Sequence, residues 1–107
     1  QAVKVNGFLF SSGQIPINPA SGNVEETTIA GQTKQVCENL QAIAEAAGIS
    51  LAQTVKTTCF LADIADFAAF NEVYAAYFTE KPARSCVAVK DLPKGVLCEV
   101  EIIAALN

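Results

Sequence analysis

Hydrophobic and polar positions follow two different periods along this chain, and the changes of period predict its secondary structure. Two short extended runs, 3–6 and 8–12, stand on either side of Gly7 and favour strands. The stretch that follows Gly13, GQIPINPASGN, is rich in proline, glycine and asparagine, which is typical of loops and turns. The chain is therefore expected to begin with two short strands and a long loop.

A long helix is predicted next. Its apolar residues follow three-, four- and seven-residue steps: Ile29, Val36, Leu40, Ile43 and Ala47. Its polar residues fall largely on the other side: Gln32, Gln35, Glu38, Gln41 and Glu45. Thr27 or Thr28 is a suitable N-cap, and Gly48 is a natural terminator. This pattern predicts a helix with one buried face.

The second half of the chain alternates strand and helix signals. The β-branched run 54–62 predicts a strand, and Asp63 can cap a second helix over roughly 66–79. Aromatic residues recur at helical spacing in that helix: Phe67, Phe70, Tyr74, Tyr77 and Phe78. We interpret this face as core rather than as a cofactor site. Residues 83–89 and 96–106 read as the last two strands.

The element order β-β-α-β-α-β-β predicts an α/β (α+β) fold. We expect residues 1–107 to form a single domain, with one mixed β-sheet and both helices packed on one face. Helical crossovers favour parallel pairing of the strands they connect, and short loops favour antiparallel pairs at the ends.

Composition narrows the possible partners. Hydrophobic residues make up 51% of the chain and charged residues only 17%, which is rich for a small domain and predicts a subunit interface. The net charge is −4, and Lys and Arg form no basic run, so binding to nucleic acid is not expected. The apolar runs are too short and too broken to span a membrane.

Four cysteines, at positions 37, 59, 86 and 98, form no C-x-x-C pair, and the chain has no His. A structural metal site is therefore not expected. Each cysteine lies within an apolar pattern, which favours reduced thiols in a cytoplasmic protein; Cys37 and Cys59 are interpreted as core.

Two acids interrupt the most apolar strand. Alternation places Cys98, Val100, Ile102 and Ala104 toward the helices, and places Leu97, Glu99, Glu101 and Ile103 on the other face. A hairpin centred near Leu92-Pro93 would set Cys86 opposite Glu99 and Arg84 opposite Glu101. That register gathers a guanidinium, a thiol and two carboxylates on one patch of sheet.

The patch has two interpretations. A cross-strand Arg–Glu pair on a wet sheet face is ordinary. In a partly apolar cleft between subunits, however, Arg84 could clamp a small carboxylate and Glu99 could activate water as a general base. Without His, Cys–His catalysis is excluded, so Cys86 either packs or binds through its backbone N–H.

Four stretches resemble the RidA-type (YjgF-type) reactive intermediate deaminases: SSGQIPINPASG, KTTCFLADIADFAAFNEVYAAYF, PARSCVAVKDLPKG and CEVEIIA. The resemblance covers nearly the whole chain, in order. It implies a chorismate-mutase-like fold, a homotrimer with clefts between subunits, and hydrolysis of 2-iminobutanoate and 2-iminopropanoate to 2-oxo acids and ammonia without metal or organic cofactor.

The same resemblance implies roles for individual residues. Arg84 would bind the substrate carboxylate and Glu99 would activate water, while Cys86, Ser12 and Asn71 would line the substrate site. Asn71 could equally be a solvated helix residue. Members of the family usually begin with a longer segment containing GPYS, so part of the N-terminal segment is expected to be missing. The segment between Phe78 and Pro82 is also shorter than in some members.

Other functions stay open at this point. A chorismate-mutase-like rearrangement would also hold carboxylates by arginine, although Arg84 is the one arginine of the chain. A non-catalytic trimer could bind small carboxylates, or act as a chaperone-like protein or translation inhibitor. An RNA-directed role is the weakest of these alternatives, because the acidic balance opposes it.

Overall fold

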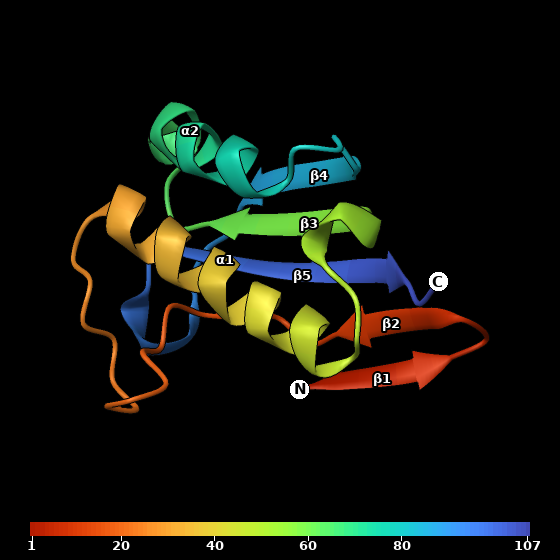
Figure 1. Cartoon of the computed structure of the whole chain (residues 1–107). Helices are drawn as coiled ribbons and strands as arrows, with labels where there is room; N and C mark the ends of the chain where they lie inside the picture. The colour runs from red at the N-terminus through yellow and green to blue at the C-terminus, as the bar shows by residue number, and fades with distance from the viewer.

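A computed structural model describes all residues, 1–107, as one five-stranded sheet with two helices on one face (Figure 1). The elements, in chain order, are β1 (Ala2–Val5), β2 (Phe8–Ser11), α1 (Ile29–Ala46), β3 (Thr54–Leu61), α2 (Phe67–Tyr77), β4 (Ala83–Ala88) and β5 (Cys98–Ala105). Short 3-10 turns precede β3, α2 and β5. This order, with one mixed sheet, confirms the predicted chorismate-mutase-like architecture.

The strands lie in the order β1-β2-β5-β3-β4. β1 and β2 pair antiparallel through the turn at Asn6-Gly7, and β3 and β4 pair parallel across the α2 crossover, as predicted. β5 pairs antiparallel with both β2 and β3. The last strand of the sequence is therefore the central strand of the sheet, and β1 and β4 are its edges.

The predicted hairpin between the last two strands is wrong, because β3 lies between β4 and β5. The connecting segment crosses the end of β3, where the Val89 N–H donates to the Leu61 carbonyl (2.9 Å) and the Ala62 N–H donates to the Leu97 carbonyl (3.0 Å). This path carries the most apolar strand into the middle of the sheet, where both of its edges are paired. Glu99 accordingly faces Phe60 of β3, and not Cys86.

The core lies between the sheet and the helices. The four residues of β5 that were predicted to face the helices, Cys98, Val100, Ile102 and Ala104, are all buried. They meet the buried side of α1, formed by Val36, Cys37, Leu40 and Ala44, and the aromatic side of α2, where Phe70 and Tyr74 are buried. The predicted aromatic core is confirmed for Phe70, Tyr74 and Phe78, whereas Phe67 is exposed.

The helix ends follow the expected chemistry. The Thr28 hydroxyl caps α1 by accepting a hydrogen bond from the Gly31 N–H (3.0 Å), which selects Thr28 from the two candidates. Gly48 follows α1 with φ +79, in the left-handed region that glycine tolerates best. Asp63 accepts from the Ala65 N–H (2.9 Å) and so caps the 3-10 turn that leads into α2.

Gln32 differs from its predicted place on the polar side of α1. Only 5% of it is exposed. Its side-chain oxygen accepts from the Leu97 N–H (2.8 Å), and its amide donates to the Glu26 carbonyl (3.0 Å). The Gln32 side chain therefore gives hydrogen-bond partners to the Leu97 N–H and to the Glu26 carbonyl, which explains why a polar residue is buried there.

The face of the sheet away from the helices carries many apolar side chains. Register places Val3 and Val5 beside Phe10 and Phe8, and Phe10 beside Ile103. Val3, Val5, Phe8 and Phe10 are exposed by 63%, 48%, 39% and 40%. We call these four residues, with Ile103, Phe60 and Val87, the open face. No helix of the chain is both long and apolar enough to cross a lipid bilayer.

Candidate functional site

Arg84 lies on the edge strand β4 and extends over α2. Its Cα partner on β3 is Thr57, whose side chain is buried on the helix side of the sheet. The guanidinium donates from Nη1 to the Asn71 side-chain oxygen (2.6 Å). Its Cζ atom also lies 5.3 Å from the centre of the Phe67 ring and 4.7 Å from the centre of the Tyr74 ring. We call Phe67, Asn71 and Tyr74 the α2 cradle.

The α2 cradle orients the charge of Arg84 without neutralising it. Asn71 is an uncharged amide, and the two aromatic rings attract a cation through their electron-rich faces. The bond to Asn71 uses one N–H of the guanidinium and leaves other N–H donors for a ligand. The arrangement can therefore hold an anion such as a carboxylate in a bidentate manner.

The backbone of β4 adds a second group at the same edge. The Val89 N–H donates inward to β3, and N–H groups alternate in direction along a strand. The N–H of Cys86 therefore points outward from the sheet edge. The Cys86 thiol lies beside Cys59 on the helix side, and burial raises the pKa of this thiol. Of the two roles predicted for Cys86, packing describes its thiol, and binding by its backbone N–H stays a prediction.

A hollow of about 450 Å³ opens beside Arg84. It is lined by Asn71, Tyr74, Ala75, Phe78, Lys81, Pro82 and Arg84. The segment between Phe78 and Pro82 forms its rim, where Lys81 takes a left-handed φ of +54. The hollow is thus bounded by the end of α2, by this turn and by the start of β4.

Glu99 lies on the other side of the sheet, in β5. Its Cα partner on β3 is Phe60, while Glu101 pairs with Thr58, so the two acids share one face as predicted. The carboxylate lies against the backbone of Gly13, where any Cβ atom would collide with it. Burial, and then repulsion by Glu101, raise the pKa of the Glu99 carboxyl group. Such a group is a stronger base than an ordinary surface carboxylate.

Ser12 precedes Gly13, whose backbone the Glu99 carboxylate contacts. Its N–H and hydroxyl both donate to the Gln1 carbonyl, at 2.9 Å and 3.1 Å. The Gln14 N–H donates to the Val100 carbonyl (2.8 Å), which fastens this segment beside β5. The Ser12 hydroxyl also accepts a hydrogen bond from the Gln14 side-chain amide (3.2 Å). The hydrogen bonds of Ser12 therefore run to Gln1 and Gln14, and it is the backbone of Gly13 that contacts the Glu99 carboxylate.

The expected single patch is consequently divided into two groups. Arg84, Cys86 and Asn71 lie at the β4–α2 edge, whereas Ser12 and Glu99 lie where the segment after β2 meets β5. Arg84 and Cys86 pair with helix-facing residues of β3, and Glu99 pairs with a residue of the open face. The register prediction failed for this reason, and one chain does not bring Arg84 and Glu99 together.

Sequence reasoning missed Phe67, Tyr74 and Thr57 as neighbours of Arg84. Phe67 and Tyr74 had been interpreted only as core. A signal was present, because positions 67, 71 and 74 repeat at helical spacing and the α2 crossover leads directly into β4. Of the two interpretations of Asn71, the structure shows its hydrogen bond with Arg84, while the side chain is only partly buried.

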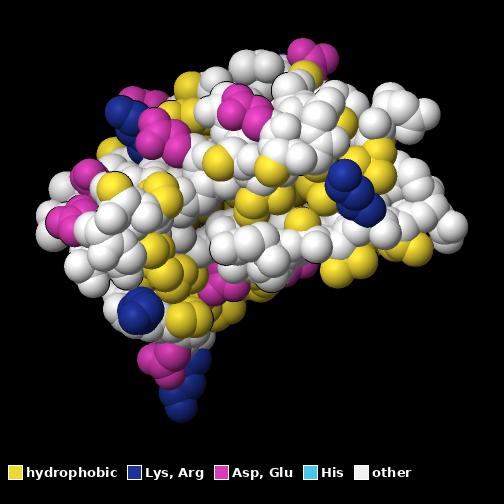
Figure 2. Space-filling model, turned by 60° about the horizontal axis from the view of Figure 1, so that its bottom comes forward, with side chains coloured by type: hydrophobic (Ala, Val, Ile, Leu, Met, Phe, Trp, Pro, Cys, Tyr) yellow, Lys and Arg dark blue, Asp and Glu magenta, His cyan; other side chains and the backbone are white.

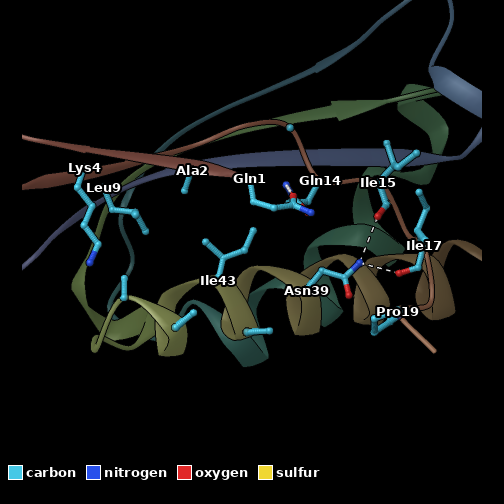
Figure 3. A pocket seen from close by; sticks show the side chains of 14 residues that line it. Gln1, Ala2, Lys4, Leu9, Gln14, Ile15, Ile17, Pro19, Asn39 and Ile43 are labelled. Carbon is cyan, nitrogen blue, oxygen red and sulfur yellow. Dashed lines mark hydrogen bonds between the residues drawn. The ribbon is translucent and has the colours of Figure 1, made fainter. Parts of the chain in front are cut away.

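The larger cavity of the molecule, of about 610 Å³, lies elsewhere, between α1 and the β1–β2 hairpin (Figure 3). Ile43 and alanines of α1 form one wall, and Ala2 and Leu9 lie opposite. At one end Asn39 donates to the carbonyls of Ile15 and Ile17, at 3.3 Å and 2.9 Å. Figure 2 shows hydrophobic side chains gathered in a hollow on this side of the molecule. Lys4 is its one charged lining residue, so it lacks the acid–cation chemistry of the predicted site.

The remaining thiols are core residues. Cys37, Cys59 and Cys98 are buried and free, as predicted for Cys37 and Cys59. Burial raises the pKa of Cys59 to about 12 and that of Cys98 to about 11, so these thiols stay protonated near neutral pH. No three His, Cys, Asp or Glu side chains are grouped in a way that could hold a metal ion.

Comparison with known proteins gives matches over nearly the whole chain. The family model described as endoribonuclease L-PSP matches residues 1–106. A RutC family protein of Pyrococcus horikoshii is 55% identical over 105 residues, which cover 97% of this chain and 83% of the relative. The 2-iminobutanoate/2-iminopropanoate deaminase of Escherichia coli K12 is 47% identical over 108 residues, which cover 97% of this chain and 84% of the relative.

A solved structure extends the similarity to the backbone. The crystal structure of Escherichia coli TdcF with bound serine has a TM-score of 0.93 and 42% sequence identity, and the match covers 98% of this chain and 85% of that one. The similarity therefore includes every strand and both helices of the fold described above.

Proposed function

This chain belongs to the RidA/YjgF/RutC (endoribonuclease L-PSP) family, and from this premise we propose that it hydrolyses small 2-imino acids to 2-oxo acids and ammonia. The substrates would be 2-iminobutanoate and 2-iminopropanoate, as in the name of the Escherichia coli relative. The observation that carries the proposal is the uncompensated guanidinium of Arg84, held by the α2 cradle at an open sheet edge.

Binding of the substrate carboxylate is assigned to the β4–α2 edge. Two N–H groups of Arg84 would bind the carboxylate oxygens, and the outward N–H of Cys86 would add a third donor. Asn71 keeps the guanidinium in place through its 2.6 Å hydrogen bond. These contacts would hold the C=N carbon at a fixed position, which gains rate through proximity.

Glu99 supplies the base in the proposed reaction. A water molecule adds to the C=N carbon while the Glu99 carboxylate accepts a proton from it. The imine nitrogen takes up that proton from Glu99, which gives the neutral carbinolamine. The carbinolamine then collapses: Glu99 passes the proton of its hydroxyl to the nitrogen, the C–O bond becomes a carbonyl as the C–N bond breaks, and ammonia leaves the 2-oxo acid. The carbon is already electrophilic, so water and one carboxylate of raised pKa suffice.

The site is proposed to form between two copies of the chain. Arg84 and Glu99 lie on opposite faces of one sheet, so the two groups can meet only if a second copy contributes one of them. The exposed apolar side chains of the open face, on which Glu99 lies, support such an interface. We propose a homotrimer, as the family resemblance implies, with one cleft at each contact. The four free thiols support a cytoplasmic location.

Subunit complementation tests this arrangement. Arg84→Ala and Glu99→Gln are each expected to abolish turnover of enzymatically generated 2-iminobutanoate while the oligomer persists. Unfolding the two variants together and refolding them as a mixture should restore about one quarter of wild-type activity, because each cleft then needs one intact residue from each of two chains. Mixing them without unfolding is the control.

Two results would reject the proposal. Full activity in Arg84→Ala would reject the deaminase site itself. Failure of the refolded mixture to regain activity, with both variants assembled, would reject a cleft built from Arg84 of one chain and Glu99 of another.

A non-catalytic carboxylate-binding function is the second candidate, and the serine bound to TdcF favours it, because serine is an amino acid and not an imine. In that case wild-type protein would bind serine through Arg84 but would not accelerate imine hydrolysis. Chaperone-like or translation-inhibiting activity would then persist in an Arg84/Glu99 double variant.

RNA cleavage, which the family description names, is not favoured by the charge of this chain. The net charge is −4 and the seven Lys and Arg residues are dispersed. We expect no salt-dependent binding to single-stranded RNA.

A further inference from the structure

We infer that Tyr74 and Thr57 are positioning residues that set the orientation of the Arg84 guanidinium, and that they do so through one buried hydrogen bond. The inference rests on the proposed role of Arg84 as the carboxylate ligand. It adds two residues to the site that contact neither the carboxylate nor the reacting carbon.

Arg84, Tyr74 and Thr57 each lie next to the other two. The Tyr74 hydroxyl and the Thr57 hydroxyl are 2.7 Å apart, and this hydrogen bond is buried. The Tyr74 ring lies under the guanidinium at 4.7 Å. Thr57 is in turn the Cα partner of Arg84 in the parallel β3–β4 pair. Strand, helix and neighbouring strand are thus linked through Tyr74, and the hydrogen bond fixes the ring at its far end.

The ring is also confined along the helix. It stacks against Phe70 on one side, with centroids 5.7 Å apart, and against Phe78 on the other, at 4.6 Å. Packing alone therefore restricts the ring to a narrow slot. Within the slot, the hydroxyl contact with Thr57 sets its depth and tilt, and hence the surface on which the cation rests.

Ordering the Arg84 side chain before binding matters because β4 is an edge strand. β4 pairs with a neighbour on one side only, and all of its residues are half-buried or exposed. A long side chain at such a position has many rotamers available, and ordering it costs conformational entropy on binding. Contacts to Phe67, Asn71 and Tyr74 order the Arg84 side chain before the ligand binds. The hydrogen bond with Thr57 keeps the Tyr74 ring, and so its contact with the guanidinium, rigid.

The test compares two tyrosine hydroxyls of the same helix. Tyr74→Phe removes the hydroxyl that contacts Thr57 and keeps the ring, and Thr57→Val removes the other partner with little change of shape. Tyr77→Phe is the matched control, since it deletes the only other tyrosine hydroxyl of the chain and Tyr77 is not part of the α2 cradle. The assembled protein is used throughout, well below the midpoint of thermal unfolding.

Two measurements are made on each variant. One is the dissociation constant for 2-oxobutanoate, the product carboxylate, by calorimetry; the other is the pair kcat and KM for 2-iminobutanoate. Tyr74→Phe and Thr57→Val should each weaken 2-oxobutanoate binding and raise KM by about fivefold, with kcat changed less than about twofold. Tyr77→Phe should match wild type in both.

The double variant separates positioning from general destabilisation. If one hydrogen bond carries the effect, Tyr74→Phe/Thr57→Val should bind 2-oxobutanoate no more weakly than either single variant. Effects that multiply in the double variant, or unchanged binding in both single variants, would overturn the inference. Arg84→Ala distinguishes the two proposals. If this variant still binds 2-oxobutanoate, Arg84 is not the carboxylate ligand and the proposed site is rejected. If it loses binding while Tyr74→Phe binds 2-oxobutanoate as wild type does, only the positioning role is rejected.

Discussion

At the scale of single residues, Glu99 combines two properties that a general base needs. It lies at the surface of the sheet, yet burial and the neighbouring Glu101 raise the pKa of its carboxyl group. Only the ionised form can accept a proton from water. We therefore expect kcat/KM to fall as the pH is lowered through this raised pKa, at a higher pH than an ordinary carboxylate would require. A pH profile of 2-iminobutanoate hydrolysis measures this, and an inflection at or below the ordinary glutamate range would contradict it.

The raised pKa of Glu99 also predicts that this residue lowers the free energy of unfolding at neutral pH. The folded chain holds the Glu99 proton more tightly than the unfolded chain does, so the free energy of unfolding decreases as the pH rises from the ordinary to the raised pKa. Glu99→Gln should therefore unfold at a higher temperature than wild type at neutral pH. The difference should disappear below about pH 4, where both states of the wild-type group are protonated. Thermal unfolding at both pH values checks the sign, and a variant less stable at neutral pH would contradict it.

Gly13 makes a further prediction at this scale. A Cβ atom at this position would collide with the Glu99 carboxylate, which is the end of a flexible side chain and can move. Gly13→Ala should therefore fold, but with the carboxylate displaced. We expect a fall in kcat of about tenfold or more, with little change in the unfolding temperature. A loss of stability with normal kcat would show that the contact serves the fold instead.

At the scale of elements, the buried side chain of Gln32 joins the start of α1 to the segment before β5. Replacing it by leucine would leave the Leu97 N–H without its partner. Gln32→Leu should lower the free energy of unfolding by about 1–3 kcal/mol, the usual cost of an unsatisfied buried group. Gln41→Leu, at an exposed position of the same helix, is the control and should change it little. Denaturant unfolding measures both.

The elements themselves could be predicted from the sequence, because each is encoded locally. The step pattern from Ile29 to Ala47 fixes α1, and the β-branched run before Leu61 fixes β3. The neighbours of β5 could not be predicted in the same way. Alternation tells which side chains of a strand share a face, but it does not tell which strand lies beside it. Proximity in sequence favoured β4, whereas the sheet places β3 there.

The candidate site shows the same limit. Arg84, Asn71 and Glu99 could be selected from residue type and from the family resemblance. The division of these residues between two faces depends on strand order, which is a property of the whole sheet. Tyr74 was assigned to the core correctly, since it is buried. Its second role, under Arg84, could not be predicted without the position of α2 over β4.

At the scale of the whole molecule, the open face predicts assembly. Phe10 is 40% exposed on that face, and Ile64 is 56% exposed on the turn before α2. Phe10→Glu should place a charge in the interface, yield particles of the 11.2 kDa single chain, and reduce turnover by about tenfold or more. Ile64→Glu is the matched control and should assemble normally. Sedimentation and activity measure both effects, and an assembled, active Phe10→Glu would contradict the interface.

The parallel β3–α2–β4 unit has a practical consequence for altering this protein. Thr57, the α2 cradle, the rim turn and Arg84 all come from one uninterrupted stretch, residues 54–88, whereas Gly13 and Glu99 come from outside it. If the proposed function holds, binding of the substrate carboxylate and activation of water are encoded in separate stretches of the chain. Replacing residues 54–88 by the same stretch of a relative that prefers a different 2-imino acid should transfer that substrate preference, while Gly13 and Glu99 stay in place.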